Sequence, residues 1–398
     1  SVHWRELGIV SRPDNCTPQP TPEYAPRALS RHPRPGHRLD TGRHRHTRAQ
    51  GCRVRSVWIR GLGGGGRSRG TFGISRSTSP LVRQLSSHMA RNVRVSVVQD
   101  EVSHSLQEGL ERTAALAAEC ARQGAELVAF PETWLPGYPV WLDVCRDVAL
   151  WDNAAVKAVY ARHAENSVEV DGESGAHLAR IARDCGVTLV VGVTERVSRG
   201  VGRGTLYNAL LTYGPDGALL NHHRKLVPTY TERLVWGHGD ASGLGAVETP
   251  VGRLGGLVCW EHWMPLSRQA LHESGEDIHV AVWPTVHDMH QVTCRQYAFE
   301  GRCFVLAAGS LMRASALPVE LEAHPDRVAS ASSWVMRGGS CIIAPDGQYL
   351  VSPVFETPAL LHVDLDLGMV RREQMSLDVA GHYSRPDVFS FSVHRERT

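Results

Sequence analysis

Cys259 is the cysteine whose surroundings best suit nucleophilic chemistry among the nine in this 398-residue sequence. It ends the apolar run 254–258 and precedes the bulky, polar residues 260–263. A thiol at the end of a buried strand, on a sharp turn into a helix, projects from the edge of a sheet. The N–H groups at the start of that helix lower the pKa of the thiol and can stabilise a developing negative charge. Taken alone, however, a cysteine after an apolar strand is more often a small core residue.

Lys225 is the second candidate, because lysine is nearly absent from this chain. Of the 43 basic residues only Lys157 and Lys225 are lysines, and all the others are arginines. Lysine differs from arginine in being a compact point charge that can change its protonation state when buried. The position of Lys225 therefore indicates a chemical role, and Glu232, seven residues further on, could hold the ammonium in place. Chance survival on a solvated face is a fair explanation for Lys157.

Glu132 is the third candidate and lies in a segment of aromatic residues and prolines, 130–139. A carboxylate at the end of a strand in such surroundings loses part of its hydration, which raises its pKa toward that of a useful general base. The alternative is an acid at the edge of a loop that caps a nearby N–H group, and this segment alone does not decide between the two.

The elements that must position these residues alternate along the chain. Apolar residues recur at helical spacing over 106–121, with Gly124 as the stop, and a second helix over 176–185 ends at Gly186. Residues 206–213 and 218–222 flank a four-residue turn and predict a hairpin. Further strand candidates are 93–99, 125–130, 187–193, 254–258, 279–283, 303–308, 341–343 and 360–364. Repeated strand–helix units with interspersed hairpins predict an α/β layered fold with partly antiparallel sheets.

Three segments resemble the catalytic segments of the nitrilase superfamily of carbon–nitrogen hydrolases, in that family's order. They are Phe-Pro-Glu-Thr-Trp-Leu-Pro-Gly-Tyr-Pro at 130–139, Arg-Lys-Leu-Val-Pro-Thr-Tyr-Thr-Glu-Arg at 224–233 and Cys-Trp-Glu-His-Trp-Met-Pro-Leu at 259–266. Downstream, the segments 283–285, 295–302 and 378–388 also resemble the nitrilase branch. The resemblance spans about residues 93 to 389.

The resemblance implies a four-layer α-β-β-α sandwich in one catalytic domain, which self-associates through its outer helical faces into homo-oligomers, built from dimers and often spiral. It implies that Cys259 is the nucleophile, Glu132 the general base and Lys225 the stabiliser of the tetrahedral intermediate. Glu232 matches the second, supporting acid of the family, and the backbone N–H near Trp260 assists the lysine.

The reaction implied is hydrolysis of an organic nitrile to the carboxylic acid and ammonia, through a cysteine thioimidate and then a thioester. Trp260 favours nitriles over amides, because amidase relatives more often have Cys-Tyr-Asp at this motif. His262 and Trp263 depart from the commoner Asn-Tyr pair, so hydrolysis of cyanide or of an amide stays an alternative. No metal or organic cofactor is needed.

Aromatic residues near the motifs are candidates for a pocket that binds an aromatic or arylaliphatic substrate, although such residues are more often packing. The candidates are Trp134, Tyr138, Trp141, Trp263 and His287. The identity of the nitrile stays open.

The charge of the chain is divided unevenly, although the net charge is only +2. Residues 1–88 hold 16 arginines against four acids, whereas the remainder carries more acids than bases. With their Pro, Gly and Ser content, residues 1–88 predict a disordered extension, for which a non-native leader ahead of Met89 is the favoured explanation. Residues 89–398 form the expected catalytic domain, with a C-terminal tail from about residue 368. Without a secretory signal or a run of about 20 apolar residues, a cytoplasmic protein with reduced thiols and no membrane contact is expected.

A Cys–His hydrolase of protease type is the nearest alternative enzyme, with His287 or His290 as the base. We interpret both as wall or structural histidines, because Glu132 and Lys225 already complete a catalytic set.

Two further alternatives have less support. Metal binding would use the pairs His44/His46 and His222/His223, which lack companion ligands at zinc spacing. Nucleic-acid binding would use the basic residues 1–88, but the acidic remainder argues against it.

Overall fold

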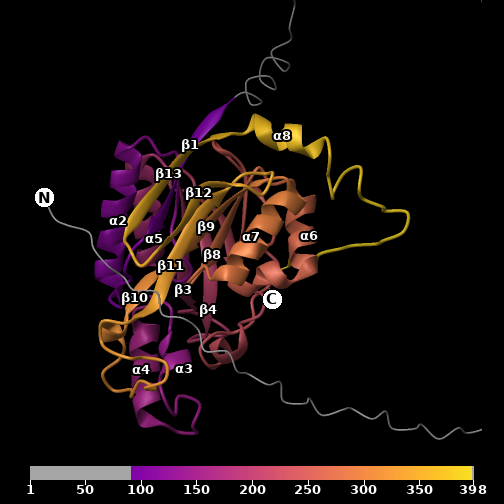
Figure 1. Cartoon of the computed structure of the whole chain (residues 1–398). Coiled ribbons are helices and arrows are strands. Elements are labelled where there is room, and N and C mark those ends of the chain that lie inside the picture. Colours follow the sequence, from indigo (N-terminus) through magenta and orange to yellow (C-terminus); the bar gives the residue numbers. More distant parts are fainter. Residues whose placement is uncertain (1–90, 397–398) are drawn as a thin grey trace, which may run out of the picture. The chain divides into compact units, whose positions relative to one another are not determined.

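The computed structural model of the chain describes residues 91–396. The expectation for residues 1–88 and the pair His44/His46 lie outside this range. Figure 1 shows two sheets side by side, with helices on their two outer sides. In the described range no helix is long and apolar enough to cross a membrane.

The first sheet has six strands in the order β13-β1-β2-β3-β4-β5. Their bounds are Ala359–Asp366, Asn92–Gln99, Leu127–Ala129, Thr188–Arg196, Leu206–Tyr213 and Leu219–Arg224. The strands β1, β2 and β3 are parallel, and the other pairings are antiparallel.

The second sheet follows the order β10-β11-β9-β8-β7-β6, and β12 pairs with β11. In the same order the bounds are Leu311–Arg313, Trp334–Ile343, Phe304–Gly309, Ile278–Trp283, Gly252–Val258 and Val247–Thr249, and β12 covers Tyr349–Phe355. Here β7, β8 and β9 are the parallel strands.

Alternation along the strands explains how the sheets stack. In β2, Leu127 and Ala129 belong to the apolar cluster that joins both sheets, whereas Val128 between them belongs to the cluster under the outer helices of the first sheet. Successive side chains of a strand point to opposite faces, so a short apolar strand serves both clusters. The sheet is therefore buried on both faces.

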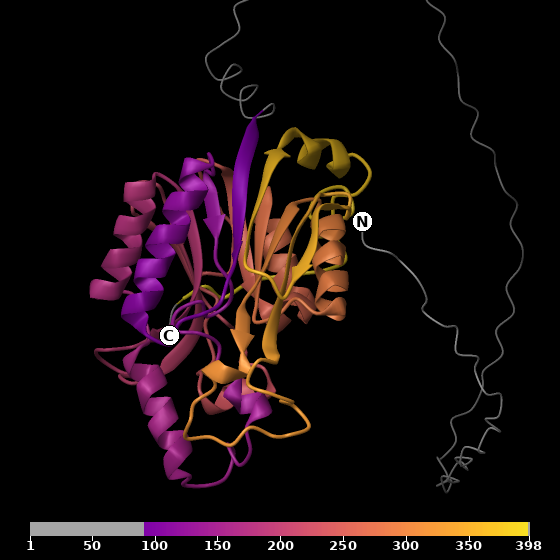
Figure 2. The ribbon, with the colours of Figure 1, turned by 60° about the vertical axis from the view of Figure 1, so that its left-hand side comes forward.

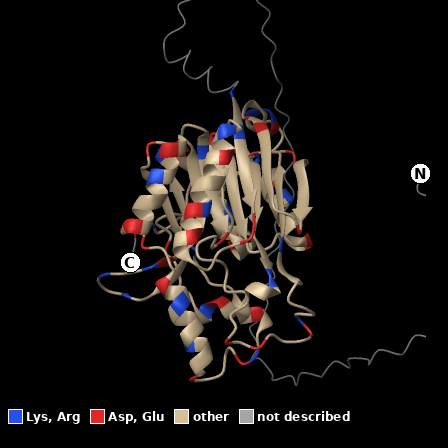
Figure 3. Cartoon of the chain, turned by 90° about the vertical axis from the view of Figure 1, so that its left-hand side faces the viewer, with Lys and Arg blue, Asp and Glu red and all other residues tan. Residues whose placement is uncertain are grey.

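Four main helices cover the outer faces and complete the predicted four layers. The helices α2 (Leu106–Arg122) and α5 (Glu173–Cys185) pack on the first sheet, and α6 (Pro265–Glu273) and α7 (Asp288–Gly301) on the second. Figure 2 shows these layers from a second direction. On the face covered by α2 and α5, acidic and basic residues are interspersed rather than gathered by sign (Figure 3).

The predicted elements from residue 93 onward are present. Their bounds differ by at most three residues, except that β11 begins at Trp334 rather than at the predicted residue 341. Helix α5 ends at Gly186, whose φ of +65° is the left-handed conformation that glycine adopts readily. The sequence predicted no ranges for α6, α7 and α8 (Gly368–Gln374), nor for the strands β6, β10 and β12, and nothing in it indicated α3 (Trp141–Val144) or α4 (Ala154–Glu165). Helix α4 buries only Val159 and His163, so it carries almost no apolar stripe to recognise.

The C-terminal part of the chain contains a last helix, α8 (Gly368–Gln374), which starts where the tail was expected. From there to residue 396 the described chain has turns but no further helix or strand.

Candidate active site

Cys259 lies immediately after β7, at the first position of a short 3-10 helix, η2 (Cys259–Trp263). Its φ of +53° is the left-handed region that non-glycine residues rarely adopt. The side chain is 5% exposed. A buried parallel strand thus holds the thiol on a sharp, strained turn, as the sequence predicted, and such strain is common at functional positions.

Glu132 follows β2, and its side chain is completely buried. One carboxylate oxygen, Oε1, accepts a hydrogen bond from Nδ2 of Asn208 at 2.7 Å. The other, Oε2, has no hydrogen-bond partner among the described residues, which leaves it available to accept a proton. Gly192 on β3 gives this segment its room, because a Cβ there would lie 2.7 Å from the Cα of Glu132.

Lys225 follows β5 directly and is also buried. Its Nζ lies 3.3 Å from Oε1 of Glu132, and 3.0 and 2.7 Å from the two carboxylate oxygens of Glu232. Glu232 also accepts hydrogen bonds from the Tyr138 hydroxyl at 2.9 Å and from the backbone N–H of Thr229 at 2.7 Å. The ammonium is therefore held between two carboxylates.

Ends of three strands bring these side chains together. A carboxylate oxygen of Glu132, one of Glu232 and the sulfur of Cys259 all lie within 4.8 Å of one another. Such a group could in principle hold a metal ion, but the ammonium of Lys225 binds both carboxylates and supplies the positive charge itself.

Burial sets the protonation of the cluster. It raises the pKa of Glu132 to about 7, against the lowering effect of Lys225. Burial also lowers the pKa of Lys225, but the nearby Glu132, Cys259 and Glu232 outweigh it, so that this pKa is raised and the side chain stays an ammonium.

The prediction of a thiol with a lowered pKa was wrong. Burial, followed by the charge of Glu132, raises the pKa of Cys259 well above its usual value. The N–H of Trp260 lowers this pKa as predicted, and Lys225 lowers it too, but both are outweighed. The resting side chain of Cys259 is therefore a thiol beside a buried carboxyl group, rather than a free thiolate.

A cavity of about 450 Å³ gives access to the thiol. Its lining combines apolar residues with a few polar groups. The lining residues are Tyr138, Val140, Asp143, Val144, Thr229, Tyr230, Thr231, Glu232, Cys259, Trp260, Pro284, Thr285, His287, His290, Val335 and Met336.

Tyr138, Trp260 and His287 are thus lining residues, whereas three predicted pocket residues are not. Trp134 is 1% exposed and packs under α2, where its Nε1 donates to Thr113 at 2.8 Å. Trp141 lines other hollows, and Trp263 lies at the surface at the end of η2. The prediction used proximity in sequence, which does not fix the direction of a side chain after a turn.

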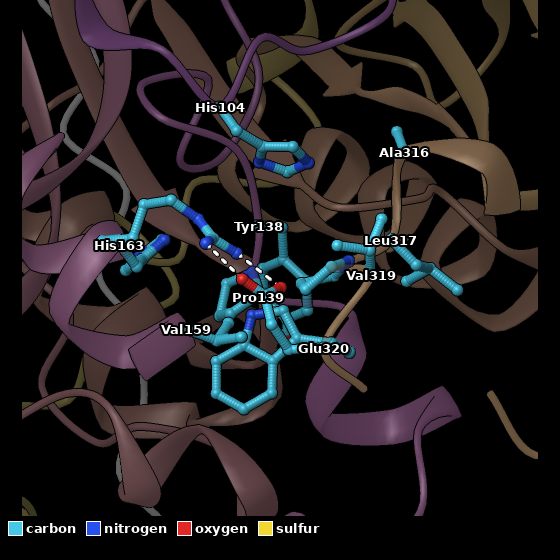
Figure 4. A pocket seen from close by; sticks show the side chains of 12 residues that line it. His104, Tyr138, Pro139, Val159, His163, Ala316, Leu317, Val319 and Glu320 are labelled. Carbon is cyan, nitrogen blue, oxygen red and sulfur yellow. Dashed lines mark hydrogen bonds and ion pairs between the residues drawn. The ribbon is translucent and has the colours of Figure 1, made fainter. Parts of the chain in front are cut away.

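A second cavity of about 260 Å³ shares the lining residue Tyr138 with the first (Figure 4). Glu320 in its wall pairs with Arg162 at 2.6 and 3.0 Å. Burial lowers the pKa of His163 in the same wall to about 3, so this histidine is neutral.

Two supporting residues were missed at the sequence level. Asn208 lies in the predicted hairpin strand 206–213, where an amide among mostly apolar residues was a signal. Glu261 was described only as polar; it is buried, accepts from the backbone N–H groups of Val258 and Leu226, both at 2.8 Å, and contacts His223. It therefore links the residue before the cysteine to the residue after the lysine.

The histidines of the alternative predictions lie in different surroundings. His287 and His290 both line the cavity, as expected of wall residues. His222 contacts Glu195 and His223 contacts Glu261, so the two neighbours on β5 have different partners. In the described range the candidate metal group consists of Glu132, Glu232 and Cys259, without a histidine.

Comparison with known proteins shows the family to which the chain belongs. The carbon-nitrogen hydrolase family model matches residues 94–373, and the chain belongs to this family. It is 37% identical over 317 residues to a bifunctional nitrilase/nitrile hydratase of Lupinus angustifolius, covering 78% of this chain and 89% of that protein. It is 36% identical over 305 residues to an aliphatic nitrilase of Sinorhizobium fredii, covering 76% and 96%.

Solved structures agree on the fold. A carbon-nitrogen hydrolase superfamily protein of Xanthomonas campestris matches with a TM-score of 0.56 at 21% identity, covering 76% of this chain and 100% of that one. A carbon-nitrogen hydrolase of Helicobacter pylori matches with a TM-score of 0.55 at 19% identity, covering 72% and 93%. The predictions of the nitrilase family, the hydrolase class and the layered α/β fold are confirmed.

Proposed function

We propose that this protein hydrolyses an organic nitrile to the carboxylic acid and ammonia, with Cys259 as nucleophile, Glu132 as general base and Lys225 as electrostatic stabiliser. The observation that carries the proposal is the buried group of Glu132, Lys225 and Cys259 at the cavity. Relatives named as nitrilases, at 36% and 37% identity over most of the chain, support the nitrile as substrate.

The first half of the reaction follows from the protonation of the cluster. Glu132 takes the proton of Cys259, and the thiolate adds to the nitrile carbon. Glu132 passes this proton to the nitrile nitrogen, which gives the thioimidate and leaves Glu132 ionised again. The ammonium of Lys225 and the N–H of Trp260 stabilise the negative charge that develops during addition.

Water completes the reaction in two steps. Glu132 activates a water molecule that adds to the thioimidate carbon and forms a tetrahedral intermediate. Expulsion of ammonia leaves a thioester, and a second water frees the acid and returns the proton to the thiol. Expulsion of the thiol instead would release the amide. That branch is a second product to consider, because one relative is named a bifunctional nitrilase/nitrile hydratase.

A panel of aliphatic, aromatic and arylaliphatic nitriles, with cyanide and the corresponding amides, tests the proposal. We expect ammonia and carboxylic acid in equal amounts from at least one organic nitrile, because ammonia and thiol are each released once per turnover. Ammonia, acid and amide are quantified for each compound. Turnover of amides or cyanide in the absence of turnover of any organic nitrile would contradict the proposed substrate.

The pH dependence of kcat/KM should report the base. Glu132 acts as a base only when ionised, and its ionised fraction falls as pH drops through about 7. We therefore expect kcat/KM to fall by about tenfold per pH unit below this pKa. Rates with a nitrile measured from about pH 5 upward in buffers of constant ionic strength check this. A flat acidic limb would remove Glu132 from the role of base.

A further inference from the structure

Behind the active-site cysteine, three buried side chains form a continuous line of hydrogen bonds. Nδ1 of His262 lies 2.6 Å from the backbone carbonyl oxygen of Cys259. Nε2 of His262 lies 3.0 Å from Nε2 of His279, and Nδ1 of His279 lies 2.6 Å from Oε1 of Glu276. None of the three side chains takes part in the proposed chemistry.

The line is enclosed by the second sheet and its helices. His262 and His279 are 0% exposed, and Glu276 is 4% exposed. The Tyr297 hydroxyl from α7 donates to Oε2 of Glu276 at 2.6 Å, and the Tyr297 ring stacks on His279 at 3.9 Å between centroids. Gly255 on β7 makes room for the carboxyl group, because a Cβ there would lie 1.9 Å from its Oε1.

Donors and acceptors in this line determine how many protons it holds. A carbonyl oxygen only accepts, so Nδ1 of His262 carries a hydrogen. The contact between the two histidines needs one N–H and one lone pair, and the contact to Glu276 needs one hydrogen as well. If both imidazoles are neutral, Glu276 must supply that hydrogen as a carboxylic acid. If Glu276 is ionised, one of the histidines must be an imidazolium.

Every arrangement that satisfies all three contacts therefore has the same total. The line holds one proton more than an ionised carboxylate with two neutral imidazoles. We infer that His262, His279 and Glu276 are positioning residues that share this one buried proton, and that the proton keeps the carbonyl of Cys259 hydrogen-bonded and the nucleophile in place. The inference concerns positioning in the proposed reaction and rests on that function.

Loss of the shared proton must break one contact. Three arrangements are then possible: a lone pair of His279 faces the carboxylate at 2.6 Å, two Nε2 lone pairs face each other at 3.0 Å, or a lone pair of His262 faces the carbonyl of Cys259 at 2.6 Å. In the last arrangement the strained turn at Cys259, with its φ of +53°, directly loses a hydrogen bond that holds it. In the other two the line behind this turn is only partly satisfied, which is costly for a buried polar network, so the support of the thiol depends on the proton.

The surroundings favour keeping the proton on Glu276. Burial raises the pKa of Glu276 to about 7, opposed by His272 and the Tyr297 hydroxyl, and burial lowers the pKa of His279 to about 3. Other titratable groups near the line act on its members or on their neighbours. His272 on α6 acts on Glu276, and Glu261, His223 and His290 act on the two histidines. Arg268 acts on His272, and Asp277 and Glu300 act together with Glu276 on Cys303.

Glu276→Gln is the decisive variant. The amide group of glutamine donates to His279 and its oxygen accepts from Tyr297, so it reproduces the protonated acid without a titratable proton. In the wild-type enzyme kcat should fall on the alkaline side as the shared proton leaves. In Glu276→Gln we expect a neutral-pH rate within about threefold of wild type and no such fall, with the acidic limb of Glu132 retained.

Tyr297→Phe is the second variant and keeps the ring that packs on His279. Removing the hydroxyl takes a donor from the ionised form of Glu276, which raises the pKa of this group further. The alkaline limb should then move up by about one pH unit. This variant decides the question if Glu276→Gln does not fold.

A folded Glu276→Gln enzyme that is inactive at neutral pH, or one whose alkaline limb is unchanged, would overturn the inference. An alkaline limb that does not move in Tyr297→Phe would also overturn it.

Alkylation of Cys259 by a haloacetamide, followed by peptide mass spectrometry, gives a readout that needs no nitrile. The rate of alkylation is measured in both proteins over a range of pH. The rate in Glu276→Gln divided by the rate in the wild type should rise with pH, because only the wild type loses the shared proton. If this ratio rises but the wild-type enzyme turns over no nitrile, the proposed substrate is contradicted and the shared proton is still supported.

Discussion

Cys259→Ala should abolish nitrile turnover, lowering kcat by about four orders of magnitude or more, because no covalent intermediate can form. Alanine keeps the Cβ at this left-handed position, so the backbone strain at φ +53° is unchanged and the fold should be retained. The expected loss is therefore chemical. It is measured as single-turnover release of ammonia together with the thermal unfolding temperature.

Cys120→Ala is the matched control for this variant. Cys120 is as deeply buried as Cys259 but lies on α2, in the cluster beneath the outer helices of the first sheet. Its change to alanine removes one buried sulfur and should cost about 1 kcal/mol of stability, with most of the activity retained. Equal losses of activity in both variants would remove Cys259 from the role of nucleophile.

Much of the site could be predicted from the sequence, because Glu132 and Cys259 closely follow apolar strands and Lys225 is one of only two lysines in the chain. A strand that ends at Val258 leaves Cys259 at the sheet edge, and the order of the three motifs indicated which cysteine among nine to choose. The pairing of Lys225 with Glu232 also followed from the sequence, since both lie in one segment.

The rest depended on contacts that spacing does not encode. Trp134 is in the motif of Glu132, but the turn directs its ring to Thr113 on α2, away from the cavity. The raised pKa of Cys259 reflects its burial and the charge of Glu132, which the pattern of a single strand cannot report. The line from His262 to Glu276 joins η2, β8 and the loop before it, so it exists only after the parallel pairing of β7 with β8.

Lys225→Arg should also lose most of the activity, although it keeps the positive charge. Nζ lies within 3.3 Å of Glu132 and within 3.0 Å of both oxygens of Glu232, in a side chain that is 1% exposed. A planar guanidinium is larger than an ammonium and holds its donors in a fixed fork, so it cannot point a charge at both carboxylates and at the reacting nitrogen. We expect kcat to fall by about 10²- to 10³-fold, as for the loss of one stabilising donor.

The second lysine of the chain provides the control for this prediction. Lys157 is exposed on α4 and pairs with Asp152 at the surface, so Lys157→Arg should leave both kcat and the unfolding temperature unchanged. Exposed ion pairs contribute at most about 1 kcal/mol, and arginine can replace lysine in them. A lower unfolding temperature in Lys225→Arg would report overpacking, so the activity of this variant is measured well below its unfolding temperature.

A near-normal kcat in folded Lys225→Arg would contradict the prediction. It would mean that the ammonium only neutralises Glu132 and Glu232, and that the N–H of Trp260 stabilises the charge on the substrate instead.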